Sequence, residues 1–213
     1  MIQEVVAVID RSGSMAGKES DTIGGINATI DELKQNKVDE NGNSTSIVKF
    51  SIKFFDHQEK LMINSLDIEN ITPLKVSDLK PRGQTALLDA MGNTITHFIN
   101  KKKCDPSSFD TCIIYVATDG IENCSIEYTK EEIKNLVEEA KQYSIEILYL
   151  GANQDSILEA NQLGLDATQA LNYSETTESV ESAYRSAARA AKRYRTGEDI
   201  SFLDFERQES YVN

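Results

Sequence analysis

Two short polar segments of the chain carry oxygen atoms that could hold a metal ion. Asp10, Ser12 and Ser14 come directly after a short apolar run near the start of the chain. Asp119 follows a second apolar run, with Thr118 between them. Alternate residues of an extended segment point the same way, so the first three side chains can converge on one point, and Gly13 permits a close turn. Because ligands of open α/β sheets bind at the carboxyl ends of the strands, both segments are expected at one ligand site.

The types of these side chains indicate which metal the site would hold. All of the donors are hard oxygen atoms, which suit Mg²⁺ or Mn²⁺ better than Zn²⁺. Ca²⁺ usually recruits more carboxylates and carbonyls, so Mg²⁺ is the expected ion and Mn²⁺ the alternative. Only Asp10 and Asp119 are charged, and the other donors are neutral hydroxyls. If the aspartates act partly through water, the metal keeps an open position for an anionic oxygen from outside.

The elements that must position these residues follow from the pattern of apolar residues. Apolar runs alternate with helical patterns, which predicts an α/β fold with a mainly parallel sheet and helices on both faces. The first strand is an unbroken Val/Ile run, typical of a strand covered on both faces in the middle of a sheet. The second and third strands are joined by a short connection, 56–59, which predicts a hairpin and an antiparallel third strand. The expected strands are 4–9, 47–55, 60–66, 111–117, 145–150 and 167–171.

Helices are expected between these strands because apolar residues recur at spacings of three and four. A T-x-x-E pattern at Thr129 and Glu132 predicts a capping box at the start of one of them. We expect one domain over residues 1–195 and a C-terminal tail, 196–213, that is docked or mobile. The expected helices are 21–35, 86–101, 129–142, 155–163 and 178–195.

The segment D-R-S-G-S-M, which begins at Asp10, resembles the D-x-S-x-S signature of von Willebrand factor A domains. In that family the signature begins the metal-ion-dependent adhesion site. Two further family elements have matches, Thr85 in G-Q-T ahead of a helix and Asp119 in A-T-D-G. The resemblance implies that Ser12, Ser14 and Thr85 contact the metal directly. It also implies that Asp10 and Asp119 act mostly through water.

The resemblance spans most of the chain and implies a doubly wound, Rossmann-like sheet of about six strands with one antiparallel edge strand. The segments T-D-G-I-E-N from Thr118 and L-G-A-N from Leu150, with the Ala/Arg-rich last helix, are similar to a narrower group. These are small stand-alone intracellular members of the family from bacteria and their viruses.

The net charge and the cysteine content indicate which classes of partner and which cellular compartment are expected. The formal net charge of −13 opposes binding to nucleic acid and to anionic membranes. We find no apolar run of about 18 residues and no signal peptide. Cys104, Cys112 and Cys124 are odd in number and lack C-x-x-C spacing, which predicts neither a disulfide framework nor a thiolate zinc site. A reducing, cytoplasmic location is expected.

These features together predict a metal-dependent protein-binding module, in which an acidic side chain of a partner completes the Mg²⁺ coordination. An enzyme is not expected, because the chain has no G-x-S-x-G, P-loop or G-x-G-x-x-G motif. Two alternatives remain. One is a Mg²⁺-dependent phosphoryl-transfer or hydrolytic enzyme with His57 or Glu122 as base, and the other is an adaptor subunit of an AAA-type ATPase assembly. Asp89 is a candidate for ordering the Thr85 loop or capping a helix. The sequence does not indicate an oligomeric state.

Overall fold

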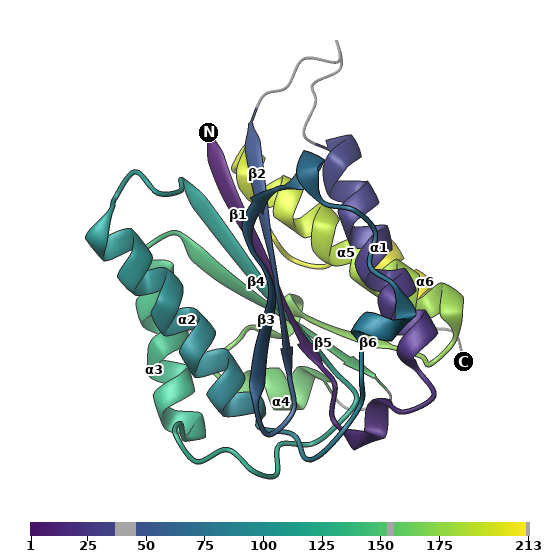
Figure 1. The fold of residues 1–213 in the computed structure, drawn as a ribbon. Coiled ribbons are helices and arrows are strands. Elements are labelled where there is room, and N and C mark those ends of the chain that lie inside the picture. Colours follow the sequence, from purple (N-terminus) through teal and green to yellow (C-terminus); the bar gives the residue numbers. More distant parts are fainter. Residues whose placement is uncertain (37–45, 153–155, 212–213) are drawn as a thin grey trace.

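A six-stranded sheet runs through the middle of the molecule, with helices on both faces (Figure 1). The computed structural model describes residues 1–36, 46–152 and 156–211. The strand order is β3-β2-β1-β4-β5-β6, and all neighbours are parallel except β2 and β3. This confirms the predicted fold class, including the antiparallel edge strand. The strands are β1 Ile2–Asp10, β2 Ile47–Phe55, β3 Glu59–Asp67, β4 Thr111–Thr118, β5 Ile145–Ala152 and β6 Ala170–Tyr173.

The position of β1 follows from its sequence. Its residues 5–9 are at most 2% exposed, because helices cover both faces of the sheet at this point. Val5, Ala7 and Ile9 belong to one apolar core, whereas Val6 and Val8 belong to the other. This alternation is the two-residue period of a strand. As the unbroken Val/Ile run predicts, β1 lies between β2 and β4.

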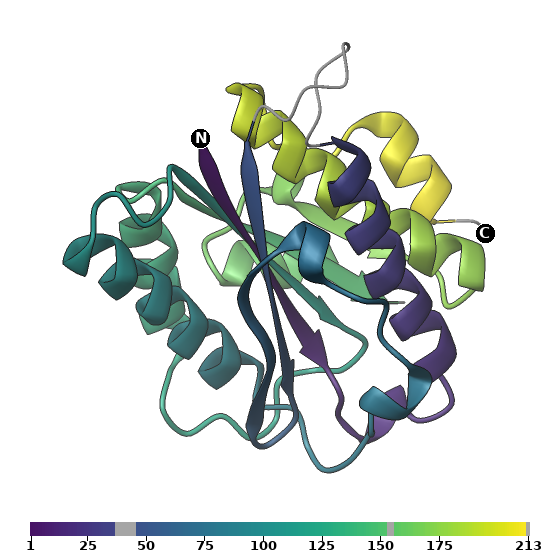
Figure 2. The ribbon, with the colours of Figure 1, turned by 45° about the horizontal axis from the view of Figure 1, so that its top comes forward.

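The helices divide between the two faces of the sheet, and Figure 2 shows α1 and α5 side by side on one of them. The capping box at Thr129 and Glu132 is confirmed, since each side chain accepts a hydrogen bond from the other's backbone N–H. The first core lies under α1 Glu19–Asn36 and α5 Thr177–Thr196, with α6 Asp204–Ser210 against α5. The second lies under α2 Leu87–Cys104, α3 Lys130–Lys141 and α4 Ser156–Gln162.

The close packing of α1 on α5 depends on a glycine. A β-carbon on Gly25 would lie 2.8 Å from the ring of Tyr184 in α5, so any larger residue would push the helices apart. Thr29 adds a polar contact, because its hydroxyl donates to the carbonyl of Tyr184 at 3.0 Å. Gly25 therefore lets the two helices approach.

The elements near the C-terminus differ in detail from the sequence prediction. Residues 167–169 form a 3-10 turn rather than the start of a strand, because the Gln169 side chain accepts from the backbone of Asp166 and closes the turn. The strand β6 therefore begins at Ala170. The predicted start of the preceding helix, at residue 155, lies outside the described residues.

Residues beyond 195 include α6, which packs against α5 and β6. Glu206 is fully buried and accepts two hydrogen bonds from Arg193, at 3.0 and 2.9 Å. Arg207 donates to the carbonyl of Ala170 at 2.8 Å. The part of the predicted tail, 196–213, that forms α6 therefore packs against the rest of the described chain. Among the helices of the described residues, none combines the length and the apolar character needed to cross a membrane.

Candidate metal centre

Asp10 and Thr118 are the last residues of β1 and β4, which are parallel neighbours. Their carboxyl ends therefore meet at one edge of the sheet, as the sequence predicts. The Asp10 carboxylate is fully buried. Its Oδ1 accepts from the backbone N–H of Ser12 at 2.6 Å, and its Oδ2 accepts from the hydroxyl of Thr118 at 2.6 Å. Both contacts fix the direction in which the carboxylate points.

The two serines continue this chain of contacts from β1 to β4. Their Oγ atoms lie 3.0 Å apart, and the Oγ of Ser14 donates to Oδ1 of Asp119 at 2.6 Å. The 3-10 turn Gly13–Met15 sets this arrangement. Ser12 is buried and Ser14 is exposed, so the row of oxygen atoms leads from the sheet edge to the surface.

Thr85 reaches the same point from the loop before α2. A β-carbon built on Gly120 would lie 3.1 Å from Oγ1 of Thr85, 3.4 Å from Oγ of Ser14 and 3.5 Å from Oδ2 of Asp10. Oxygen atoms from three separate segments therefore surround the space over one glycine. The structure brings all five predicted residues together, and we refer to Asp10, Ser12, Ser14, Thr85 and Asp119 as the metal centre.

The donor set of the metal centre fits a small hard cation. Two carboxylates and three hydroxyls offer oxygen atoms only, as Mg²⁺ and Mn²⁺ prefer. Burial raises the pKa of Asp10, although hydrogen bonds from Thr118 and Ser12 act in the opposite direction. A cation beside this carboxylate would offset the cost of burying its charge. In the described part of the chain, no group of three or more His, Cys, Asp or Glu side chains is placed to hold a metal ion.

Comparisons with known proteins identify the family to which this chain belongs. The family model for the von Willebrand factor type A domain matches residues 4–186. The chain belongs to the von Willebrand factor type A family. No curated protein sequence matches it significantly.

Solved structures share the von Willebrand factor A fold at low sequence identity. Proximal thread matrix protein 1 from the mussel byssus is 15% identical with a TM-score of 0.61, and the match covers 90% of this chain but 46% of that one. The chain thus spans about half the length of the mussel protein. The vWF domain of the type V pili tip protein Mfa5 from Porphyromonas gingivalis is 14% identical, with a TM-score of 0.61 and coverage of 92% and 95%. Manganese-loaded TRAP protein from Plasmodium vivax is 17% identical, with a TM-score of 0.57 and coverage of 81% and 68%.

In this von Willebrand factor A domain, Asn123 positions Thr85, a role that sequence reasoning missed. The side-chain Oδ1 of Asn123 accepts from the backbone N–H of Thr85 at 3.0 Å. The backbone N–H of Asn123 donates to the carbonyl of Thr85 at 3.1 Å. The two contacts form a closed pair between the loops after β4 and before α2. The sequence shows Asn123 only as the last letter of T-D-G-I-E-N, and no spacing rule links it to a residue 38 positions away.

Glu122 and Asp89 order the segment after Asp119. Glu122 accepts from the backbone N–H groups of Leu88, Cys124 and Ser125, at 3.0, 2.9 and 2.7 Å. Asp89 accepts from three successive N–H groups, those of residues 126–128. Asp89 therefore orders this segment rather than the Thr85 loop itself. Glu122 is committed to backbone groups, so its geometry gives no support to its candidacy as a catalytic base.

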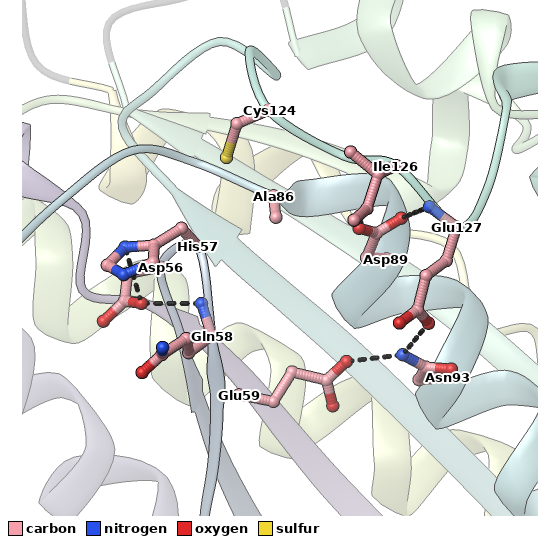
Figure 3. Close-up of a pocket in the computed structure, with 10 residues that line it drawn as sticks. All are labelled: Asp56, His57, Gln58, Glu59, Ala86, Asp89, Asn93, Cys124, Ile126 and Glu127. Carbon is pink, nitrogen blue, oxygen red and sulfur yellow. Dashed lines mark hydrogen bonds and ion pairs between the residues drawn. The ribbon is translucent and has the colours of Figure 1, made fainter.

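A cavity of about 410 Å³ lies beside the Thr85 loop, and Figure 3 shows its lining. Its carboxylates are already engaged. Asp56 is buried between Arg11 and Arg82, with Oδ2 at 2.8 and 2.9 Å from their Nε atoms. Glu59 and Glu127 both accept from the Asn93 amide, at 2.8 and 2.9 Å. The cavity thus carries structural ion pairs and hydrogen bonds, and His57, the other candidate base, lies at its rim beside Asp56.

Proposed function

We propose that the protein is a metal-dependent protein-binding module that captures an acidic side chain of a partner. The metal centre would hold the cation through Asp10, Ser12, Ser14, Thr85 and Asp119, with Mg²⁺ as the expected ion and Mn²⁺ as the alternative. The bound ion would supply an electrophilic charge to which a carboxylate oxygen of the partner is attracted. The observation that carries the proposal is the convergence of three neutral hydroxyls and only two carboxylates on one point.

The surface around the metal centre supports contact with a protein. Ser14 and Gly13 are exposed, so a partner side chain can reach this edge of the sheet. Ile121 and Ile126, in the segment after Asp119, are 73% and 91% exposed. The contacts of Glu122 and Asp89 hold this segment in place, so little conformational entropy would be lost when a partner packs against it.

The family supports the coarser part of the proposal. Solved structures with this fold include a pilus adhesin and the manganese-loaded TRAP protein. The mussel protein has also been solved with zinc in its metal-ion-dependent adhesion site (MIDAS) motif. Divalent ions thus bind at this motif in relatives. For this chain we propose Mg²⁺, a protein rather than a nucleic acid or membrane partner, and a cytoplasmic location. The oxygen-only donor set supports Mg²⁺, the net charge of −13 supports a protein partner, and the free thiols of all three cysteines support the location.

The proposed function is tested by a pull-down, in which the wild-type protein captures its partner from an extract of the native cell in Mg²⁺ and in EDTA. We expect a partner that is retained in Mg²⁺ and lost in EDTA. Thr85→Ala should lower that capture about tenfold, which is about 1.4 kcal/mol, while Thr85→Ser should retain it because the hydroxyl remains. Equal capture in EDTA, or equal capture by Thr85→Ala, would place the partner surface elsewhere.

A further inference from the structure

Lys18 lies against the metal centre, just before the start of α1. Its Nζ is 2.5 Å from Oδ2 of Asp119 and 2.5 Å from Oε1 of Glu175, which precedes α5. The ammonium group therefore joins three segments that are far apart in the sequence. No spacing rule predicts this contact, since Lys18 and Asp119 are 101 residues apart.

With this contact, both carboxylate oxygens of Asp119 have a hydrogen-bond donor. Oδ2 pairs with Lys18, and Oδ1 accepts from the hydroxyl of Ser14. The Asp119 side chain is 2% exposed, so water screens this ion pair poorly on the aspartate side. The Lys18 side chain is 30% exposed, so its ammonium group can turn toward solvent when a divalent ion takes its place beside Asp119.

Lys18 also changes the charge that a divalent ion would meet. Asp10, Asp119 and Glu175 bring three negative formal charges, and the ammonium group of Lys18 offsets one of them. Arg11, the neighbouring cation in the signature, is turned to Asp56 instead. Among the described residues, Lys18 is thus the cation that forms an ion pair with a residue of the metal centre.

Resting on the proposed function, we propose that Lys18 is a tethered cation that competes with the divalent ion for Asp119. It lowers the affinity for metal and leaves the loaded centre one positive charge richer. The loaded centre is one unit less negative than it would be without Lys18, so it attracts an acidic partner more strongly. Lys18 thus lowers the affinity for the divalent ion and strengthens the attraction of the partner's carboxylate.

The test is the affinity for Mn²⁺ alone, measured by calorimetry on the full chain. Lys18→Met, which keeps the length of the side chain without its charge, should bind Mn²⁺ about tenfold more tightly than wild type, or about 1.4 kcal/mol. Lys18→Arg keeps the charge and should stay within about threefold of wild type. Lys103→Met is the matched control, because Lys103 forms an exposed ion pair with Glu139 at the far end of α2, roughly 24 Å along the helix from the Thr85 loop. It removes the same charge from the chain and should leave the affinity unchanged.

The possible results separate this inference from the proposed function. Equal Mn²⁺ affinity of Lys18→Met and wild type, or weaker binding by Lys18→Met, would overturn the competition and make Lys18 a residue that only holds Asp119 in place. A wild-type protein and a Lys18→Met variant that both fail to bind Mn²⁺ would contradict the metal centre itself. Unfolding of each variant in chelator shows whether the fold is retained.

Discussion

An Asp10→Asn variant is expected to bind Mn²⁺ about 100-fold more weakly than wild type, while its stability in chelator does not fall. Loss of one of two charged groups at a metal centre is at least as costly as loss of an outer-shell partner, for which 10- to 100-fold is typical. The amide can keep the local contacts, because its oxygen can accept from Ser12 and its NH₂ can donate to the Thr118 hydroxyl. Calorimetry with Mn²⁺ and urea unfolding in EDTA measure the two effects.

The pH dependence of stability provides a control for this variant. Burial raises the pKa of Asp10 above its ordinary value of 3.8, so the folded state holds a proton that the unfolded state has already lost. This difference exists between pH 3.8, the ordinary pKa, and the raised pKa of the folded state. The free energy of unfolding in chelator therefore falls as pH rises through this window. Asp10→Asn has no such proton, so its stability relative to wild type should rise across that window. A variant that is less stable than wild type at pH 7 in EDTA would show that Asp10 is a structural residue.

A Gly120→Ala variant is expected to weaken Mn²⁺ binding about 30-fold or more, by occupying the space that the oxygen atoms surround. Its β-carbon would lie 3.1 Å from Thr85 Oγ1, closer than an ordinary van der Waals contact. Gly120 is not among the glycines with positive φ, so the backbone accepts alanine. Gly24→Ala is the matched control, because its β-carbon would meet only Glu181 Oε1, at an ordinary 3.7 Å. Undiminished Mn²⁺ binding by Gly120→Ala would mean that the ion lies away from this space.

The sequence was sufficient for the features that depend on local patterns. The Val/Ile run of β1 predicted a central strand, the 56–59 connection predicted the antiparallel edge, and T-x-x-E predicted the cap of α3. The convergence of Asp10, Ser12 and Ser14 followed from alternation along an extended segment. Each of these features requires only neighbours in the chain, and the rule that parallel strands end at one edge then brings in Asp119.

The features that the sequence did not predict depend on contacts between distant segments. Lys18 meets Asp119 across 101 positions, and Asn123 meets Thr85 across 38. Surface lysines and loop asparagines are common, so residue type alone gave no reason to select these two. The Thr85 assignment came from the family resemblance, because no local pattern connects that loop with β1. The 3-10 turn before β6 was missed since it depends on one side-chain contact of Gln169.

One divalent cation is expected at the point where Asp10, Ser14 and Thr85 meet. Electron paramagnetic resonance of Mn²⁺ measures its binding, because the sharp six-line signal of free Mn²⁺ is lost when the ion binds protein. We expect wild-type protein to remove one equivalent of Mn²⁺ from the free signal, Mg²⁺ to displace the bound Mn²⁺, and Asp10→Asn to leave the free signal nearly intact. A free signal that wild-type protein does not diminish at millimolar Mn²⁺, or that Asp10→Asn diminishes equally, would mean that these residues hold no cation.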